Sequence, residues 1–149
     1  MKAQGLSSLF TKYGTLIALL LLLVSFSLFI NGFVDPENLM NILRQIALLL
    51  IIAEGFTMVL IVGELDLSFA NVASLASVLV AGLIIRGIPF WIAIVITLFV
   101  GAMFGFVNGF LVTRIGISSL ITTLATGIIA NGLIYLYTKG VSFYGNIPL

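Results

Sequence analysis

Long apolar runs separated by short polar segments dominate the chain, and this pattern predicts membrane-spanning helices. A run of about 18 or more mostly apolar residues suits a helix that crosses a bilayer. Five such helices are predicted, at about residues 13–30, 39–62, 67–85, 90–113 and 117–138. They take up nearly the whole chain and leave no stretch for a soluble domain. The predicted fold is therefore all-α, a polytopic transmembrane helix bundle that forms a single domain over residues 1–149.

The first run has an alternative interpretation as a signal peptide, because a basic start precedes an apolar stretch. The run over residues 13–30 is longer than the usual apolar part of a signal peptide, and no cleavage site of small residues follows it. We therefore expect an uncleaved membrane helix. The next helix has a well-formed start, with Asp35 as a suitable cap, Pro36 at the first helical position and Glu37 at the positive end of the helix dipole.

Residues 63–68 interrupt the apolar pattern between the second and third runs. Gly63 permits the backbone conformation that ends a helix. Asp66 and Ser68 have side chains that bond to nearby backbone N–H groups and cap a new helix. We expect a deliberate break between two membrane helices, at a cytoplasmic boundary or inside a polar cavity. The simplest roles are a cap for Asp66 and a solvated turn for Glu64, with gating or partner contact as the alternative.

Small residues mark two of the predicted helices as close-packing elements. Gly101, Gly105 and Gly109 recur at four-residue spacing and place one groove along a helix face, although glycine is common enough in membrane helices for chance to produce such a series. The third helix is rich in alanine, serine and glycine, namely Ala70, Ala73, Ser74, Ala76, Ser77, Ala81 and Gly82. We expect it to be buried in the bundle, away from lipid.

Composition narrows the function classes. Charged residues make up 7% of the chain and hydrophobic residues 62%, against about 25% charged in a soluble domain. The net charge of +1 comes without a basic cluster, which argues against nucleic-acid binding. The chain holds neither cysteine nor histidine, and no nucleophile–base pair, metal-ligand cluster or phosphate-binding glycine loop occurs. We expect no catalysis, no metal and no cofactor.

Four strongly polar residues lie near or within the predicted spans: Glu54, Asn71, Asn108 and Asn131. Glu54 is the acid that lies deepest in a span, and an ionisable residue at membrane depth is a functional candidate by default. A structural hydrogen bond to a neighbouring helix is an equally good interpretation. The three asparagines could line a hydrophilic path or simply bond one helix to another.

The orientation of the chain is weakly determined by its cations. With the N-terminus in the cytoplasm, half of the six cations lie inside, namely Lys2, Lys12 and Arg114, and half outside, namely Arg44, Arg86 and Lys139. This is a tie under the positive-inside rule, and the first helix then favours an N-terminus inside.

Three blocks of sequence resemble the inner-membrane permease subunits of ABC importers of the ribose class, within the branched-chain amino acid and monosaccharide importer family. The first block is residues 36–45. The second is residues 55–59 leading into Gly63-Glu64-Leu65-Asp66-Leu67-Ser68. The third is residues 105–112 with 115–117 and 123–126. They follow the family's order, and their combination is specific.

The chain also departs from that family's pattern. Phe69-Ala70 stands where Val-Gly is usual, Glu54 where an apolar residue is common, and no proline lies near Ser118. Permeases of the family are about twice as long, and residues 146–149 are expected to stop in mid-loop. The resemblance therefore implies the N-terminal half of a permease whose ATPase-docking element lies elsewhere.

The resemblance implies a part of the membrane path for a ribose-like monosaccharide, in a bacterial inner membrane. It also implies a second permease subunit, two cytoplasmic ATPase subunits and an extracytoplasmic solute-binding protein as partners, with ATP hydrolysed on the ATPases. One alternative is half of a proton- or ion-coupled secondary transporter, in which Glu54 or Asp66 takes protons. The other is a non-transporting membrane scaffold.

Overall fold

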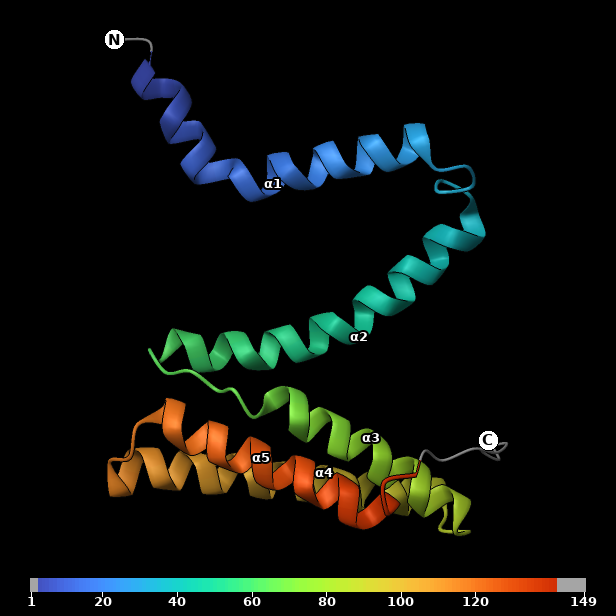
Figure 1. The fold of residues 1–149 in the computed structure, drawn as a ribbon, viewed down its shortest axis with the longest axis vertical. Coiled ribbons are helices and arrows are strands. Elements are labelled where there is room, and N and C mark those ends of the chain that lie inside the picture. The colour runs from blue at the N-terminus through green and yellow to red at the C-terminus, as the bar shows by residue number, and fades with distance from the viewer. Residues whose placement is uncertain (1–2, 142–149) are drawn as a thin grey trace. The chain divides into compact units, whose positions relative to one another are not determined.

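A computed structural model describes the backbone of residues 3–141 and the side chains of residues 10–141. Within that range the chain forms five α-helices and one π-helical turn, without a strand, so the all-α prediction is confirmed. The elements are α1 (Ala3–Phe29), α2 (Pro36–Ile61), α3 (Phe69–Ile85), α4 (Phe90–Phe110), the π-helical turn η1 (Leu111–Ile115) and α5 (Ser119–Thr138) (Figure 1). The expectation about residues 146–149 lies outside the described residues.

Four of the described helices are long and apolar enough to cross a membrane. The other, α3, has 17 residues, which at about 1.5 Å per residue spans somewhat less than a hydrocarbon core of about 30 Å. Its ends are set by the break before Phe69 and by the turn after Ile85. The chain is thus a multi-pass membrane protein, and α3 is the predicted span that falls just short of full length.

The helix bounds agree with the sequence pattern, apart from the start of α1. That helix begins at Ala3, about ten residues before the apolar run, because nothing in the polar residues 3–12 stops a helix from extending outward. Pro36 is the first residue of α2 and Glu37 lies in its first turn, as its start signals predict. The α4 helix continues into η1, and Gly116 closes that turn at a φ of 83°.

The chain divides into two compact units, residues 1–51 and residues 52–149. The first unit contains α1 and the first part of α2, joined by a turn. In that turn the rings of Phe26 and Phe33 lie 5.6 Å apart, and Asn38 Nδ2 donates to the Phe33 carbonyl over 2.7 Å. This local pairing fixes the turn itself.

The second unit contains the last part of α2 together with α3, α4, η1 and α5, and within it α3 packs against both α4 and α5 (Figure 1). Small residues permit the close approach. A Cβ atom on Gly82 would overlap the Tyr137 ring, and the Arg86 guanidinium lies 4.7 Å from the centre of the same ring. Most α3 side chains are buried or half-buried, in agreement with the small-residue composition of this helix. The fold therefore places α3 between two other helices.

Candidate functional site

The break between α2 and α3 has the geometry that its sequence predicts. Gly63 has a φ of 84°, a left-handed conformation that costs glycine little. The Gly63 N–H donates to the Leu60 carbonyl over 3.0 Å, and the Glu64 N–H reaches back to the Val59 carbonyl over 3.2 Å. This pairing is a Schellman ending, which satisfies the last carbonyls of α2. An extended segment then runs to Phe69, where α3 begins.

The start of α3 differs in detail from the expected cap. The N-cap residue is Ser68, and its hydroxyl makes no bond to the N–H groups of the helix. Asp66 instead accepts two bonds at Oδ1, from the Ser68 N–H over 2.7 Å and from the Ser68 hydroxyl over 2.6 Å. A short aspartate side chain reaches the N–H two residues ahead more easily than the helix beyond it. Asp66 therefore fixes the capping residue and does not cap α3 itself.

A chain of buried hydrogen bonds links this break to α4 and α5. Asn108 on α4 donates through Nδ2 to the Ser68 hydroxyl oxygen over 3.0 Å. Its Oδ1 accepts from the Thr126 hydroxyl of α5 over 2.8 Å. Ser68, Asn108 and Thr126 are 1%, 7% and 6% exposed, so the network lies inside the unit. The bonds all run in one direction, from Thr126 to Asn108, from Asn108 to Ser68 and from the Ser68 hydroxyl to the Asp66 carboxylate. In such a chain each hydrogen bond polarises and strengthens the next.

Hydroxyl groups of α5 also bind the backbone of the extended segment. The Leu67 N–H donates to Thr123 Oγ1 over 3.0 Å, and the Leu65 N–H donates to Ser119 Oγ over 3.4 Å. The Thr123 hydroxyl in turn donates to the Ser119 carbonyl over 2.7 Å. An interrupted helix exposes backbone groups that lipid cannot satisfy. These side chains supply the missing partners.

Gly127 allows α5 to lie directly against the break. A Cβ atom at this position would come within 3.3 Å of the Ser68 Cα atom and 3.1 Å of Asn71 Nδ2. Both distances are tighter than most real Cβ contacts. The absence of a side chain at Gly127 thus sets how closely α5 approaches the first turn of α3.

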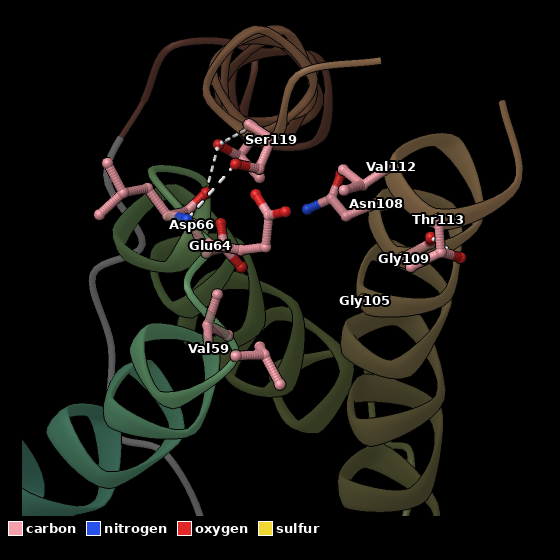
Figure 2. A pocket seen from close by; sticks show the side chains of 12 residues that line it. Val59, Glu64, Asp66, Gly105, Asn108, Gly109, Val112, Thr113 and Ser119 are labelled. Atoms are coloured by element: carbon pink, nitrogen blue, oxygen red, sulfur yellow. Dashed lines mark hydrogen bonds between the residues drawn. The ribbon is translucent and has the colours of Figure 1, made fainter. Parts of the chain in front are cut away.

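A cavity of about 240 Å³ lies beside this network. Figure 2 shows Glu64 and Asp66 on one side of it, Gly105, Asn108 and Gly109 of α4 on the other, and Ser119 of α5 at one end. Val112 and Thr113 of η1 also line it, so the π-helical turn borders the cavity. Such turns occur often at functional sites. The cavity is the place where polar groups of three elements meet inside an otherwise apolar unit.

The candidate polar residues differ in burial and in whether they line the cavity, which the sequence could not show. Asn108 is central to the network, and Asn71 is half-buried beside Gly127. Glu54 and Asn131 are exposed and do not line the cavity. Glu64 is also exposed but does line it.

The glycine series on α4 faces no described neighbour. A Cβ atom at Gly101, Gly105 or Gly109 would meet nothing within 4 Å among the described residues. Gly105 and Gly109 border the cavity instead. The predicted groove exists as an open face, and its packing against another helix stays a prediction.

Sequence reasoning did not single out the α5 residues of this site. Ser119, Thr123, Thr126 and Gly127 all face the break. They recur at spacings of four, three and one, which is the periodicity of one helix face. The signal in the sequence is the series of hydroxyl side chains along one face at the start of α5. Such a polar face on an apolar helix indicates that it packs against a segment whose backbone groups need hydrogen-bond partners.

Comparison with known proteins identifies similar chains. Residues 38–148 match the family described as "Branched-chain amino acid transport system / permease component". The ribose import permease protein of Bacillus subtilis (strain 168) is 38% identical over 129 residues, which cover 87% of this chain and 40% of that protein. The L-arabinose ABC transporter permease protein of Azospirillum brasilense is 32% identical over 136 residues, or 91% of this chain and 40% of that protein.

A third relative is the ribose import permease protein of Escherichia coli (strain K12), which is 31% identical over 126 residues, or 85% of this chain and 39% of that protein. The chain thus spans about 40% of the length of the curated relatives it matches. No solved structure matches it.

Proposed function

We propose, from the premise that this chain belongs to the family of permease components of the branched-chain amino acid transport system, that it forms part of the membrane path of an ABC-type importer for a small, ribose-like sugar. The observation that carries the proposal is the 38% identity to a ribose import permease over 87% of the chain. The similar arabinose permease supports the same substrate class.

The chemistry of the cavity is suited to a sugar. Glu64 and Asp66 line it, and carboxylate oxygens accept hydrogen bonds from sugar hydroxyls. Asp66 Oδ1 is engaged by Ser68, whereas no hydrogen bond joins Glu64 through its side chain to another described residue. A polyol that passes this point would therefore find an available acceptor beside the other polar groups that line the cavity.

The transport cycle that we propose needs further subunits. A binding protein outside the membrane delivers the sugar to a cavity between two permease subunits, and two ATPase subunits in the cytoplasm drive the change from an outward-facing to an inward-facing cavity. ATP is hydrolysed on those subunits and not on this chain. The assembly lies in a bacterial inner membrane, with the N-terminus of this chain in the cytoplasm.

Uptake measurements test the substrate class, because the family's description names branched-chain amino acids while the relatives cited here import sugars. Labelled ribose, L-arabinose and leucine are supplied to cells with and without this chain. The proposal predicts that uptake of one of the sugars falls and is restored when the chain is supplied again, while leucine uptake is unchanged. Loss of leucine uptake with both sugars unaffected would contradict it.

A further inference from the structure

Asp66 is held at the edge of the cavity by one of its two carboxylate oxygens. Oδ1 accepts from the Ser68 N–H over 2.7 Å and from the Ser68 hydroxyl over 2.6 Å, and hydrogen bonds to a carboxylate are shorter and stronger than neutral ones. Two bonds to the same oxygen keep the carboxylate from turning. Within its unit, Oδ2 accepts no hydrogen bond from a described residue. Because Asp66 lines the cavity, Oδ2 is the acceptor that it offers to an occupant.

The Ser68 hydroxyl is itself held from α4 and α5. Its oxygen accepts from Asn108 Nδ2 over 3.0 Å, and Asn108 Oδ1 accepts from the Thr126 hydroxyl over 2.8 Å. All residues of this network and of the cavity wall belong to residues 52–149, which form one unit. The orientation of the Asp66 carboxylate is therefore set inside this unit, and in part by Thr126, which does not line the cavity.

We propose that Ser68, Asn108 and Thr126 position the Asp66 carboxylate so that its Oδ2 atom accepts a hydrogen bond from a hydroxyl group of the sugar in the cavity. The proposal rests on the proposed function, because it names the acceptor for that same sugar. An acceptor that is already oriented binds more tightly than a mobile one, since less conformational freedom is lost on binding. The cavity of about 240 Å³ lies just below the usual range of about 300–1,000 Å³ for small-molecule sites, which suits a ligand as small as a monosaccharide.

The polar groups of the cavity wall call for a ligand that donates hydrogen bonds. The carboxylates of Glu64 and Asp66 both line it. The Thr113 hydroxyl, also in the wall, donates its one proton to the Gly109 carbonyl over 2.7 Å, so its oxygen can only accept from an occupant. A sugar supplies several hydroxyl donors, whereas the side chain of a branched-chain amino acid supplies none. The wall therefore favours the sugar.

A cysteine at position 112 tests whether sugar occupies the cavity, because the chain has no cysteine of its own. Val112 lines the cavity (Figure 2). The complete transporter is purified with Val112→Cys and with cysteines elsewhere in it replaced, and the rate of alkylation by iodoacetamide is measured at increasing concentrations of the sugar that is taken up, ribose or L-arabinose. We expect the sugar to slow the reaction and leucine to leave the rate unchanged.

Substitutions on α5 test the positioning role. Thr126→Val removes the donor to Asn108 and should raise the half-protecting sugar concentration by about fivefold, a factor that corresponds to the net contribution of one hydrogen bond. Thr126→Ser keeps the hydroxyl and should leave that concentration unchanged. The matched control is Thr122→Val, one turn earlier on α5, because Thr122 is 3% exposed and its hydroxyl has no hydrogen-bond partner among the described residues. A purely structural role would lower the amount of folded transporter and not alter the half-protecting concentration.

Asp66→Asn tests the acceptor itself and decides the matter if Thr126→Val fails to fold. Asparagine keeps the oxygen that Ser68 binds and replaces the other with an amide group, so the half-protecting concentration should rise by about tenfold. Equal protection in Asp66→Asn and the unaltered chain would overturn the proposal. So would equal effects of Thr126→Val and Thr122→Val.

Two further outcomes would also overturn it. A thiol that does not react in the absence of sugar would show that the cavity is closed to water, and a thiol that reacts equally fast with sugar present would show that the sugar does not enter. Alkylation needs neither ATP nor transport. Sugar uptake that depends on the chain, without protection of the thiol, would therefore remove this site and leave the proposed function standing, whereas loss of leucine uptake alone would contradict the proposed function itself.

Discussion

Asn108 is the residue through which the break, α4 and α5 are joined. Its amide donates to Ser68 on one side and accepts from Thr126 on the other, and it is 7% exposed. Apolar side chains gain little by leaving lipid for a protein interior, so buried hydrogen bonds and close packing supply much of the attraction between membrane helices. At the residue scale, the unit is therefore held by a few polar contacts.

Replacing Asn108 with leucine should destabilise this unit. The substitution keeps a similar volume but removes the acceptor of Thr126 and the donor to Ser68, and a buried polar group left without its partner costs about 1–3 kcal/mol. Thermal unfolding in detergent, followed by size-exclusion chromatography, measures the loss. The matched control is Asn131→Leu, an exposed position on α5 that should be close to neutral. Equal effects of the two variants would show that the network contributes nothing specific.

Asp66 can be tested for its charge separately from its hydrogen bonds. Asparagine retains the Oδ1 atom that accepts from the Ser68 N–H and hydroxyl, so Asp66→Asn should fold normally. Asp66→Leu removes both bonds and should lower the folded fraction. If Asp66→Leu folds as well as the unaltered chain, the structural role is refuted. If Asp66→Asn folds but sugar uptake stops, the charge itself acts in the transport path.

At the scale of elements, the close contact between α5 and the start of α3 fixes the site. The break exposes backbone N–H groups, and α5 satisfies two of them through Ser119 and Thr123. The contact needs a residue without a side chain at Gly127. The side chains of α5 thus bind the backbone of the extended segment, and α5 lies directly against the start of α3. Neither helix can shift without breaking these contacts.

Gly127→Val should therefore disrupt the unit. The added side chain meets the backbone of Ser68, which cannot move aside as a flexible side chain can. Gly132→Val is the matched control on the same helix, since a Cβ atom there meets nothing within 4 Å. We expect a clear fall in the unfolding temperature for the first variant and little change for the second. Similar unfolding temperatures would mean that α5 lies farther from the break than the structure shows.

The open glycine face of α4 leads to a prediction about assembly. Gly105→Leu should leave this unit folded, because a Cβ atom there meets no described atom within 4 Å and the side chain has the cavity to enter, but it should weaken the complete transporter where another helix packs on this face. Gly105→Ala should be much milder. Native gel electrophoresis of the purified complex measures the difference. Intact assembly with both variants would show that the face meets lipid or the cavity only.

The sequence predicted the elements better than the contacts between them. Apolar run length and the turn signals around Gly63 and Pro36 act locally, so the helices and the break could be predicted from them. The ranking of Asn108 above Asn131 could not, because both are asparagines inside apolar helices and differ only in which helix they face. Sequence spacing also could not show that the N-cap position falls on Ser68 and that the Asp66 side chain accepts from the Ser68 N–H. The two arrangements differ by only one residue in how far the Asp66 side chain reaches along the backbone.

At the scale of the whole molecule, the described residues expose many large apolar side chains, among them Leu28, Ile61 and Trp91. In a bilayer such side chains are satisfied by lipid, whereas a carboxylate such as Glu54 is not. The chain also spans about 40% of the length of its relatives. We therefore expect the functional transporter to surround these helices with further protein.

An ABC-type importer draws its energy from ATP and an ion-coupled transporter from a gradient, so the energy source of uptake decides between them. Membrane vesicles that contain the complete transporter receive the binding protein, the labelled sugar identified by the uptake comparison, and ATP on the side of the ATPases. We expect uptake to persist when an uncoupler abolishes the proton gradient, and to stop when ATP is removed while the gradient is kept. Uptake that collapses with the gradient while ATP persists would contradict it and favour an ion-coupled transporter.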